Sequence, residues 1–531
     1  MVLIRKKDSG SLATTFKRSA VSAPPVSAAS VKPQARKSRP QVAKTLPSSR
    51  CRGVRSLHGR AKVAKTISKS RSVGQKVVNL KNLKRPSTTI SAASTLTASH
   101  KTLLESWGPA LTQRLAAIRQ KWSMQHRVGA LGREAASVVK IGTDCSGAEA
   151  PIWALKAMRV PHQHVFSCDW QEGVRDFIRA TCPPAGPIFE DMLTRSSKDI
   201  PAMDVYVCGF PCTPFSNLRG HSTRLLNEEA AKPFFKVLDV LRECQPKLAI
   251  LENMMGIRRV MKKVLRYLRA LKVYWIIVLP INSVDLGEPV SRPRYYFLLV
   301  RRDVGVLGSA EEIKSFVATM AHGAHEKVTC HVASRLLTKD SPSVQQCLKN
   351  VKEEAPVGRG VGKSDSHAWP AQHERFRVAK RLRPGTSSVG LGTERMRSAF
   401  HLLRQVAGTD IIGDFSQSIG RVALRTDGIC PTVTPNGVLY VEGRGVDRVV
   451  MPREKLLLHL FPIHKMQIPP NFPEGDLGKL GGNTMHLKSV GLALTIGLAL
   501  VDFAQVGSSG SALKKAMPVI EVPFNVVRCG L

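Results

Sequence analysis

Apolar and polar positions divide the chain into a polar first segment and a longer part with regular strand and helix patterns. From residue 138 onward, short apolar runs alternate with stretches in which apolar residues recur every three or four positions. The short runs indicate buried strands, and the wider spacing indicates amphipathic helices. We therefore expect a doubly wound, Rossmann-like α/β domain. The expected strands are 138–141, 164–167, 205–208, 248–251, 275–279 and 295–300, with a helix at 229–244.

The segment before these strands has the pattern of an amphipathic helix. Within 101–135, apolar residues recur at helical spacing at Leu103, Trp107, Leu111, Leu115, Ile118 and Trp122. We expect this helix to pack on the α/β core; binding of a partner protein is the alternative.

The α/β core is expected to span 136–301 and to resume at 451–505, where a long apolar helix lies within 482–505. The intervening residues, 302–450, lose the strand and helix rhythm and predict a smaller second domain. Within it, 431–434 and 437–441 have the pattern of a hairpin. Residues 506–531 are expected to form a tail.

Residues 1–100 have the composition of a disordered basic tail. They contain one Phe, no Trp and no Tyr, and therefore bury too little apolar surface to offset the entropy of ordering. They hold 22 Lys and Arg against one acid, Asp8, within a chain whose net charge is +41. This charge indicates a polyanionic partner such as nucleic acid, and a targeting peptide is the alternative for the tail.

Composition also argues against two classes of protein. The 11 cysteines include no CxxC pair, so we expect no metal site, and their irregular spacing is typical of a reducing compartment. No stretch approaches the roughly 20 apolar residues that a membrane helix needs, so we expect no membrane association. The sequence does not indicate an oligomeric state.

Reactive side chains lie at the ends of three expected strands. One strand leads into Gly-Phe-Pro-Cys212, where glycine and proline turn the backbone and present the thiol. A second strand ends at Glu252 and Asn253, and Arg292 and Arg294 precede a third. Because sites in parallel α/β sheets form beyond the carboxyl ends of the strands, we expect these groups to form one active site.

The order of these motifs resembles that of the C5-cytosine DNA methyltransferases. That family has a cofactor motif, a Pro-Cys, a Glu-Asn, an Arg-x-Arg, a variable target-recognition region and a closing Gly-Asn. The corresponding series in this chain is residues 145–150, Pro211-Cys212, Glu252-Asn253, Arg292-Pro293-Arg294, residues 302–420 and Gly482-Asn483. The resemblance covers roughly residues 138–505, and the ordered set is far more specific than any one motif.

The resemblance implies methylation of cytosine C5 in DNA, on a base swung out of the duplex. Cys212 would add to C6 of the ring, since the thiolate is the reactive form of cysteine. Glu252 would hydrogen-bond or protonate N3, and Asn253 would position the loop that carries Cys212. Arg294 would contact O2 and orient Glu252, with support from Arg292.

The cofactor that the resemblance implies is S-adenosylmethionine. Small residues in the loop after the first strand would let the backbone approach this ligand. Asp169 would accept hydrogen bonds from the ribose, and Asp191, or Glu190 as the alternative, would contact adenine. The full set expected to bind the cofactor is Cys145, Ser146, Gly147, Ala148, Glu149, Asp169, Trp170, Asp191, Pro211, Asn483 and Thr484.

Four positions depart from the usual pattern of the family, which is typical of a divergent eukaryotic or algal member. Cys145 stands where Phe is usual, Glu149 where Gly is usual, Thr213 where Gln or Asn is common, and Val290 where Gln is common. The expected catalytic residues are intact, so we expect an active enzyme. Two alternatives stay open: a tRNA cytosine-5 methyltransferase, and a catalytically impaired homologue that binds chromatin.

The expected partner is double-stranded DNA, held by the 302–450 region. Arg425, Arg444 and Arg448 are candidates for phosphate contacts, and solvated surface charges are the alternative. A DNA substrate implies a nuclear location; a plastid or mitochondrial location follows instead if the basic tail is a transit peptide.

Overall fold

The structure is a computed structural model that describes residues 96–126, 138–211, 229–337, 341, 344–345, 368–469, 472–504 and 518–522. All of them lie in one of the two units into which the chain divides, the unit that includes Thr89–Leu531. The predicted disordered tail lies outside the described residues except for its last five positions. There the predicted boundary at residue 100 is wrong, because helix α1 begins at Ala98 and Leu96 is buried.

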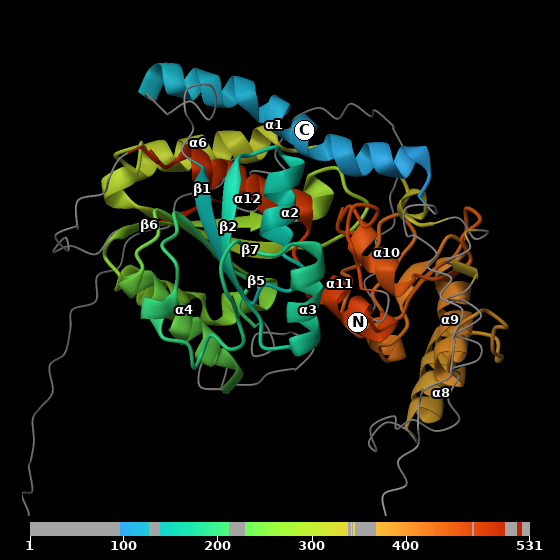
Figure 1. Ribbon diagram of the computed structural model, residues 1–531. Helices are drawn as coiled ribbons and strands as arrows, with labels where there is room; N and C mark the ends of the chain where they lie inside the picture. The colour runs from blue at the N-terminus through green and yellow to red at the C-terminus, as the bar shows by residue number, and fades with distance from the viewer. Residues whose placement is uncertain are drawn as a thin grey trace, which may run out of the picture. The chain divides into compact units, whose positions relative to one another are not determined.

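An eight-stranded sheet with the order β12-β6-β7-β5-β4-β1-β2-β3 forms the centre of this unit (Figure 1). Neighbouring strands pair in parallel except at β7, which runs antiparallel to both β5 and β6. The expectation of a doubly wound α/β fold is confirmed. The strands are β1 (Val139–Asp144), β2 (His162–Cys168), β3 (Ile188–Phe189), β4 (Val205–Cys208), β5 (Leu248–Met254), β6 (Tyr274–Ile281), β7 (Arg294–Arg301) and β12 (Val519–Glu521).

Alternating side chains of the strands build one hydrophobic layer on each face of the sheet. In β4, Val205 and Val207 face one layer, and Tyr206 and Cys208 face the other. This period of two is the pattern of a strand buried on both faces. The first layer is covered by α1 (Ala98–His126), α2 (Ala150–Ala157), α3 (Glu172–Thr181), α6 (Ala310–Gly323) and α12 (Leu487–Ala499), and the second by α4 (Lys232–Glu243) and α5 (Met261–Arg269) (Figure 1).

Helix α6 packs on the core, although the sequence placed its residues in the second domain. Ser309 caps it through a capping box with Glu312, and its apolar face packs against α1 and α12. The polar flanks of this helix hid its helical period from the sequence pattern. Within the described residues, no helix is long and apolar enough to cross a membrane.

A second, four-stranded sheet with the order β11-β10-β8-β9 lies in the smaller domain. The hairpin predicted from 431–434 and 437–441 is wrong, because β10 pairs with β8 and β11 and 431–434 is not a strand. The Asp414 carboxylate accepts from the Val438 amide (3.0 Å) and the Thr434 hydroxyl (3.1 Å), and thereby fixes this segment as a turn. The elements are α8 (Trp369–Lys380), α9 (Glu394–Ala407), β8 (Ile412–Asp414), β9 (Leu424–Arg425), β10 (Leu439–Val441) and β11 (Arg448–Val449).

The C-terminal part returns to the core through α10 (Pro452–Leu457), α11 (Glu474–Asn483) and α12. The apolar helix expected within 482–505 corresponds to α12, which begins later, at Leu487. Residues 518–522 are not part of a simple tail, because β12 adds a parallel strand to the sheet beside β6. With three residues, of which only Val519 and Ile520 are apolar, β12 is too short to be recognised as a strand from its pattern.

A buried ion pair ties β1 to the turn that follows β3. Arg195 donates to both oxygens of Asp144 at 2.8 Å, and the Tyr206 hydroxyl donates to the same carboxylate at 2.7 Å. The Arg195 guanidinium also lies over the rings of Phe166 and Phe189. A buried charge without its partner is costly, so each side chain depends on the other.

We predict that Arg195→Met lowers the free energy of unfolding by about 3–5 kcal/mol, because Asp144 stays buried without its counter-charge. Urea denaturation of the full chain measures the change. The matched control is Arg179→Met, which removes an exposed partner of Asp176 and should change stability little. Equal stabilities of the two variants would contradict this view of the pair.

Candidate functional site

A carboxylate and a guanidinium meet where β5 and β7 lie side by side. The Nε atom of Arg294 lies 2.9 Å from Oε1 of Glu252, and both side chains are 12% exposed. The antiparallel pairing sets Glu252 opposite Tyr296 and Arg294 opposite Met254. The structure therefore brings together two of the residues that the sequence placed in one active site.

The environment of Glu252 favours a carboxyl that can hold a proton. Burial raises the pKa of Glu252, and the positive charges of Arg294 and Arg292 act against that rise. The backbone after β4 passes close by, because a Cβ atom added at Gly209 would lie 3.3 Å from Oε2 of Glu252 and 2.9 Å from Met485. Glycine at 209 is thus what permits this close approach.

Cys212, the expected nucleophile, lies outside the described residues, and so does Thr213. The described chain reaches Pro211, two residues after Gly209, and Pro211 itself is half-buried. Asn253 is fully buried, and its side-chain amide donates to the Phe210 carbonyl at 3.0 Å. Asn253 therefore fixes the backbone that leads to Cys212.

Arg292 joins three segments of the chain. Its guanidinium donates to the carbonyls of Val433 (3.0 Å) and Gly482 (3.1 Å), and its backbone amide donates to the Asn282 side chain (2.9 Å). These bonds connect the start of β7 to the smaller domain and to the end of α11. Arg292 thus connects segments of the fold, whereas Arg294 is the arginine that pairs with Glu252.

The loop after β1 contains three left-handed residues. Cys145 has φ 51°, Gly147 φ 52° and Glu149 φ 56°. Cys145 is half-buried with its Sγ atom 3.7 Å from the Met192 sulfur, and Ala148 is buried in the core. At the end of β2, the Cys168 carbonyl accepts a hydrogen bond from the Ser146 backbone amide (3.1 Å), and the Cys168 backbone amide donates to the Ser146 hydroxyl (3.0 Å).

The end of β2 supplies a carboxylate and an aromatic ring beside this loop. Asp169 accepts from the backbone amides of Gly147 (3.0 Å) and Gln171 (3.1 Å), and burial raises its pKa. The neighbouring Trp170 is 75% exposed. An exposed indole next to a half-buried carboxylate presents a stacking face beside a hydrogen-bond acceptor.

The remaining expected cofactor residues lie in the turn after β3 and at the end of α11. Asp191 caps its own turn by accepting from the Leu193 amide (2.9 Å), whereas the Glu190 side chain points to solvent near Arg175. Asn483 is exposed at the last position of α11, and Thr484 after it is buried. Helix α11 approaches the loop after β1, since a Cβ atom at Gly147 would lie 4.0 Å from Leu480.

The sequence did not indicate three residues whose side chains form buried hydrogen bonds beneath these loops: Thr143, Ser167 and Arg195. Thr143 and Ser167 each interrupt an apolar strand near its carboxyl end, and that interruption was the available signal. Arg195 stands alone in a turn and had no signal in the sequence.

Two of the three arginines that were candidates for phosphate contacts are paired with carboxylates of the protein itself. Arg448 is 3% exposed and forms a two-pronged ion pair with Glu454, at 2.7 and 2.8 Å. Arg425 is paired with Asp427. Arg444 is exposed. No group of three or more potential metal ligands occurs among the described residues.

The fold and the strand-end site define a Rossmann-like α/β protein with a buried carboxylate–guanidinium pair. A statistical model of the C-5 cytosine-specific DNA methylases matches residues 145–473, more than half of the chain. The chain therefore belongs to the C-5 cytosine-specific DNA methylase family.

Individual relatives are more distant. The chain is 28% identical over 236 residues to the type II methyltransferase M.NlaIV of Neisseria lactamica, a match that covers 41% of this chain and 52% of that protein. It is 22% identical over 470 residues to the DNA (cytosine-5-)-methyltransferase DMT5 of Verticillium dahliae, covering 70% of this chain and 20% of that protein. The chain thus spans about half the length of the bacterial relative and a smaller share of the fungal one.

Among solved structures, the chain is similar to the S. pombe Dnmt2 methyltransferase. The sequence identity is 15% and the TM-score is 0.40, and the match covers 68% of this chain and 98% of that chain.

We predict that Gly482→Ala disrupts the junction between α11 and the smaller domain. The added Cβ would lie 2.2 Å from the Pro435 backbone nitrogen, which cannot move as a side chain could. We expect the free energy of unfolding to fall by about 1–3 kcal/mol in urea denaturation.

The matched control is Gly475→Ala on the same helix, where an added Cβ meets nothing within 4 Å. Alanine has the higher helix propensity, so the control should be neutral or stabilising. A Gly482 variant as stable as the Gly475 variant would show that this junction tolerates a side chain.

Proposed function

We propose that this chain methylates C5 of cytosine in DNA, with S-adenosylmethionine as the methyl donor. The observation that carries the proposal is the Glu252–Arg294 pair at the strand ends, beside the glycine that leads to Cys212. Membership of the C-5 cytosine-specific DNA methylase family supports the same chemistry.

The pair fits the polar edge of a cytosine ring. A protonated Glu252 can donate to N3, while the guanidinium of Arg294 can donate to O2 and hold the carboxyl in place. Protonation at N3 draws electrons from C6, where the Cys212 thiolate would form a covalent bond. C5 of the resulting enamine would take up the methyl group that the cofactor supplies. Loss of the original C5 proton to water would then break the C6–S bond, free the Cys212 thiolate and return the proton on N3 to Glu252.

The loop after β1 and the end of β2 fit a nucleoside-type cofactor. Asp169 offers a carboxylate to ribose hydroxyls, the exposed ring of Trp170 offers a face for adenine, and Gly147 has no side chain to block the approach. When bound, S-adenosylmethionine supplies an electrophilic methyl group. The protein residues would bind and orient this ligand.

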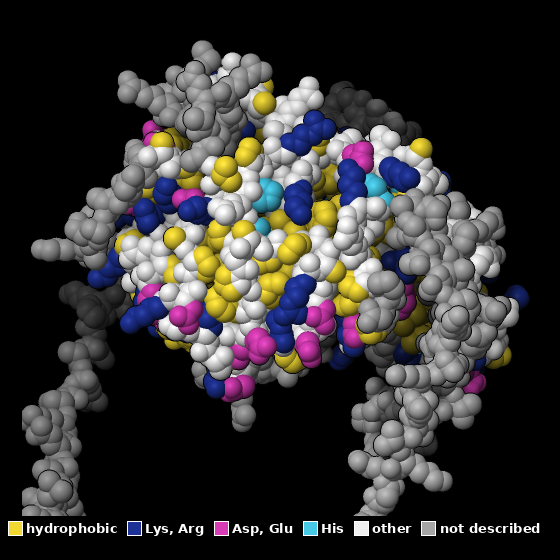
Figure 2. Space-filling model, viewed as in Figure 1, with side chains coloured by type: hydrophobic (Ala, Val, Ile, Leu, Met, Phe, Trp, Pro, Cys, Tyr) yellow, Lys and Arg dark blue, Asp and Glu magenta, His cyan; other side chains and the backbone are white. Residues whose placement is uncertain are grey.

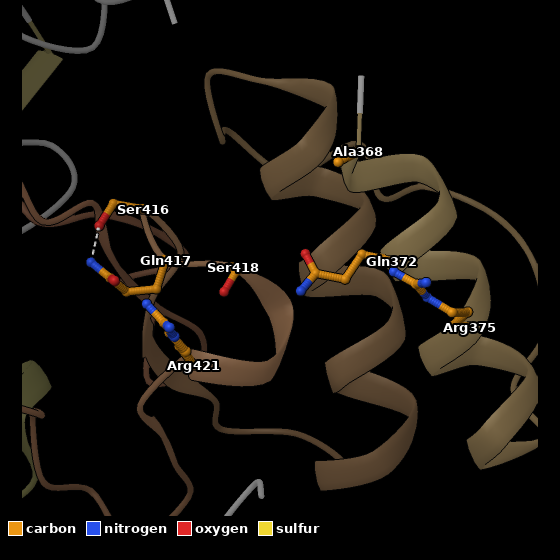
Figure 3. A pocket seen from close by; sticks show the side chains of 7 residues that line it. All are labelled: Ala368, Gln372, Arg375, Ser416, Gln417, Ser418 and Arg421. Atoms are coloured by element: carbon orange, nitrogen blue, oxygen red, sulfur yellow. Dashed lines mark hydrogen bonds between the residues drawn. The ribbon is translucent and has the colours of Figure 1, made fainter. Parts of the chain in front are cut away.

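A polar cavity in the smaller domain fits the phosphate backbone of a nucleic acid. It has a volume of about 460 Å³ and lies between α8 and the segment 416–421 (Figure 3). Arg375 and Arg421 are exposed and line it, together with side-chain amides and hydroxyls, and no acid is among its lining residues. Planar guanidiniums with adjacent neutral donors suit phosphate oxygens.

Hydrogen bonds from Arg395 hold one wall of this cavity, the segment 416–418. Arg395 donates to the carbonyls of Gln417 (2.7 Å) and Ser416 (3.0 Å), which fixes the 416–418 backbone. On the face shown in Figure 2, a central hydrophobic area is bordered by Lys and Arg side chains with Asp and Glu side chains among them.

We predict that Glu252→Gln slows covalent trapping on a DNA duplex that contains 5-fluorocytosine by about 10²-fold or more, because an amide cannot protonate N3. Denaturing gels of the protein–DNA adduct, formed with S-adenosylmethionine present, measure the rate. Cys212→Ser is the reference variant and should form no adduct while still binding the duplex. Trapping by the Glu252 variant at the unaltered rate would remove Glu252 from the mechanism.

We predict that Arg375→Ala and Arg421→Ala each weaken duplex binding and lower the slope of log K against log salt by about one. Fluorescence anisotropy over a salt series measures both quantities. The matched control is Arg377→Ala in the same helix, whose guanidinium is already bound to Glu374. Equal slopes for all three variants would show that the cavity does not contact phosphate.

A further inference from the structure

The backbone of the loop after β1 adopts a conformation that its own residues disfavour. Glu149 is the residue that precedes α2, and its φ of 56° and ψ of 44° are left-handed. A side chain disfavours this region, which is why glycine usually occupies it. A non-glycine residue persists there only if its surroundings hold it, so the side chain of Glu149 needs an explanation.

That side chain is fully buried and is surrounded by hydroxyl groups. Oε1 of Glu149 accepts from the Ser167 hydroxyl at 2.6 Å and from the Thr143 hydroxyl at 2.8 Å. The Thr143 hydroxyl also lies 2.7 Å from the Ser146 hydroxyl, and His164 Nε2 lies 3.6 Å from Oε1. Glu149 is fully buried, so its carboxyl contacts protein groups and not solvent.

These bonds join the two walls of the proposed cofactor site. Thr143 belongs to the end of β1 and Ser167 to the end of β2, and Glu149 connects both to the start of α2. Ser167 is two residues before Asp169, which accepts from the Gly147 amide. The Gly147 backbone is therefore held against the end of β2 in two ways: by the direct Ser146–Cys168 and Gly147–Asp169 bonds, and by the buried contacts that pass through Glu149.

We propose that Glu149 is the positioning residue of the cofactor loop. Its buried carboxyl joins the ends of β1 and β2 and so sets Gly147 and Asp169 for the ribose of the cofactor. Here a side-chain network fixes a turn for which glycine alone would provide only conformational freedom. The inference rests on the proposed S-adenosylmethionine site, and Glu149 acts through the loop without touching the ligand.

The protonation state of the carboxyl gives this role a pH dependence. Burial raises the pKa of Glu149 to about 8, so at neutral pH the group is largely protonated. Three titratable groups face it: His164, whose pKa burial lowers to about 4, Asp169, and the thiol of Cys182. The folded chain keeps the proton of Glu149 up to about pH 8, whereas the unfolded chain loses it near the ordinary pKa of a glutamate. The stabilisation from this proton is therefore complete below the ordinary glutamate pKa and is lost as the pH rises through about 8.

Binding of S-adenosylmethionine and of S-adenosylhomocysteine to three variants of the full chain tests the inference by calorimetry. Glu149→Gln keeps one acceptor for Ser167 and adds a donor for Thr143, so its Kd should stay within about threefold of the unaltered value. Glu149→Gly relaxes the backbone but removes the network, so its Kd should rise about tenfold or more. Glu311→Gln, an exposed acid on α6, is the control for the change from acid to amide.

Two further measurements separate this role from simple loss of stability. Hydrogen exchange at the amides of Gly147 and Cys168, without any cofactor, should quicken in Glu149→Gly and stay unchanged in Glu149→Gln. The affinity of the unaltered chain should fall between pH 7 and 9, and that of Glu149→Gln should not. Equal affinity and equal exchange in the glycine variant would overturn the inference, whereas failure of the unaltered chain to bind either ligand would overturn the cofactor assignment itself.

Discussion

The buried pair of Glu252 and Arg294 is the interaction on which the proposed chemistry depends. Neither charge would be stable at this position alone, since removal from water is costly unless a partner compensates. The antiparallel direction of β7 makes the pairing possible, because it sets the first residue of β7 beside the last residues of β5. A parallel strand in the same place would have put Arg294 at the opposite edge of the sheet. The reversed strand is therefore what brings Arg294 beside Glu252.

The residues around this pair are held by groups that do not themselves take part in the chemistry. Asn253 fixes the carbonyl of Phe210, and Arg292 links the start of β7 to the smaller domain and to α11. Asp144 and Arg195 join β1 to the turn that contains Asp191. The site thus depends on buried polar contacts at the ends of strands, where backbone loops would otherwise be free to move.

The sequence predicted those elements whose pattern is local. Apolar runs identified the central strands, and the order of Pro-Cys, Glu-Asn and Arg-x-Arg placed Glu252 and Arg294 in one site. It could not show which polar groups meet across strands, so it makes Arg448 a candidate for phosphate contact, whereas in the structure Arg448 is buried and paired with Glu454. It also missed β12 and the place of α6, because a strand of three residues and a helix with polar flanks take their positions from tertiary packing. The roles of Cys212 and of residues 1–95 and the nuclear location stay predictions.

Mass spectrometry of the reaction product decides whether this chain methylates cytosine in DNA. The full chain is incubated with S-adenosylmethionine and either an unmethylated DNA duplex or tRNA, and each nucleic acid is then digested to nucleosides. We expect 5-methyl-2′-deoxycytidine from the duplex, and its loss with Glu252→Gln. Methylation of tRNA alone would mean that the same chemistry acts on another substrate, and a duplex without any 5-methyl-2′-deoxycytidine would refute methylation of cytosine C5 in DNA.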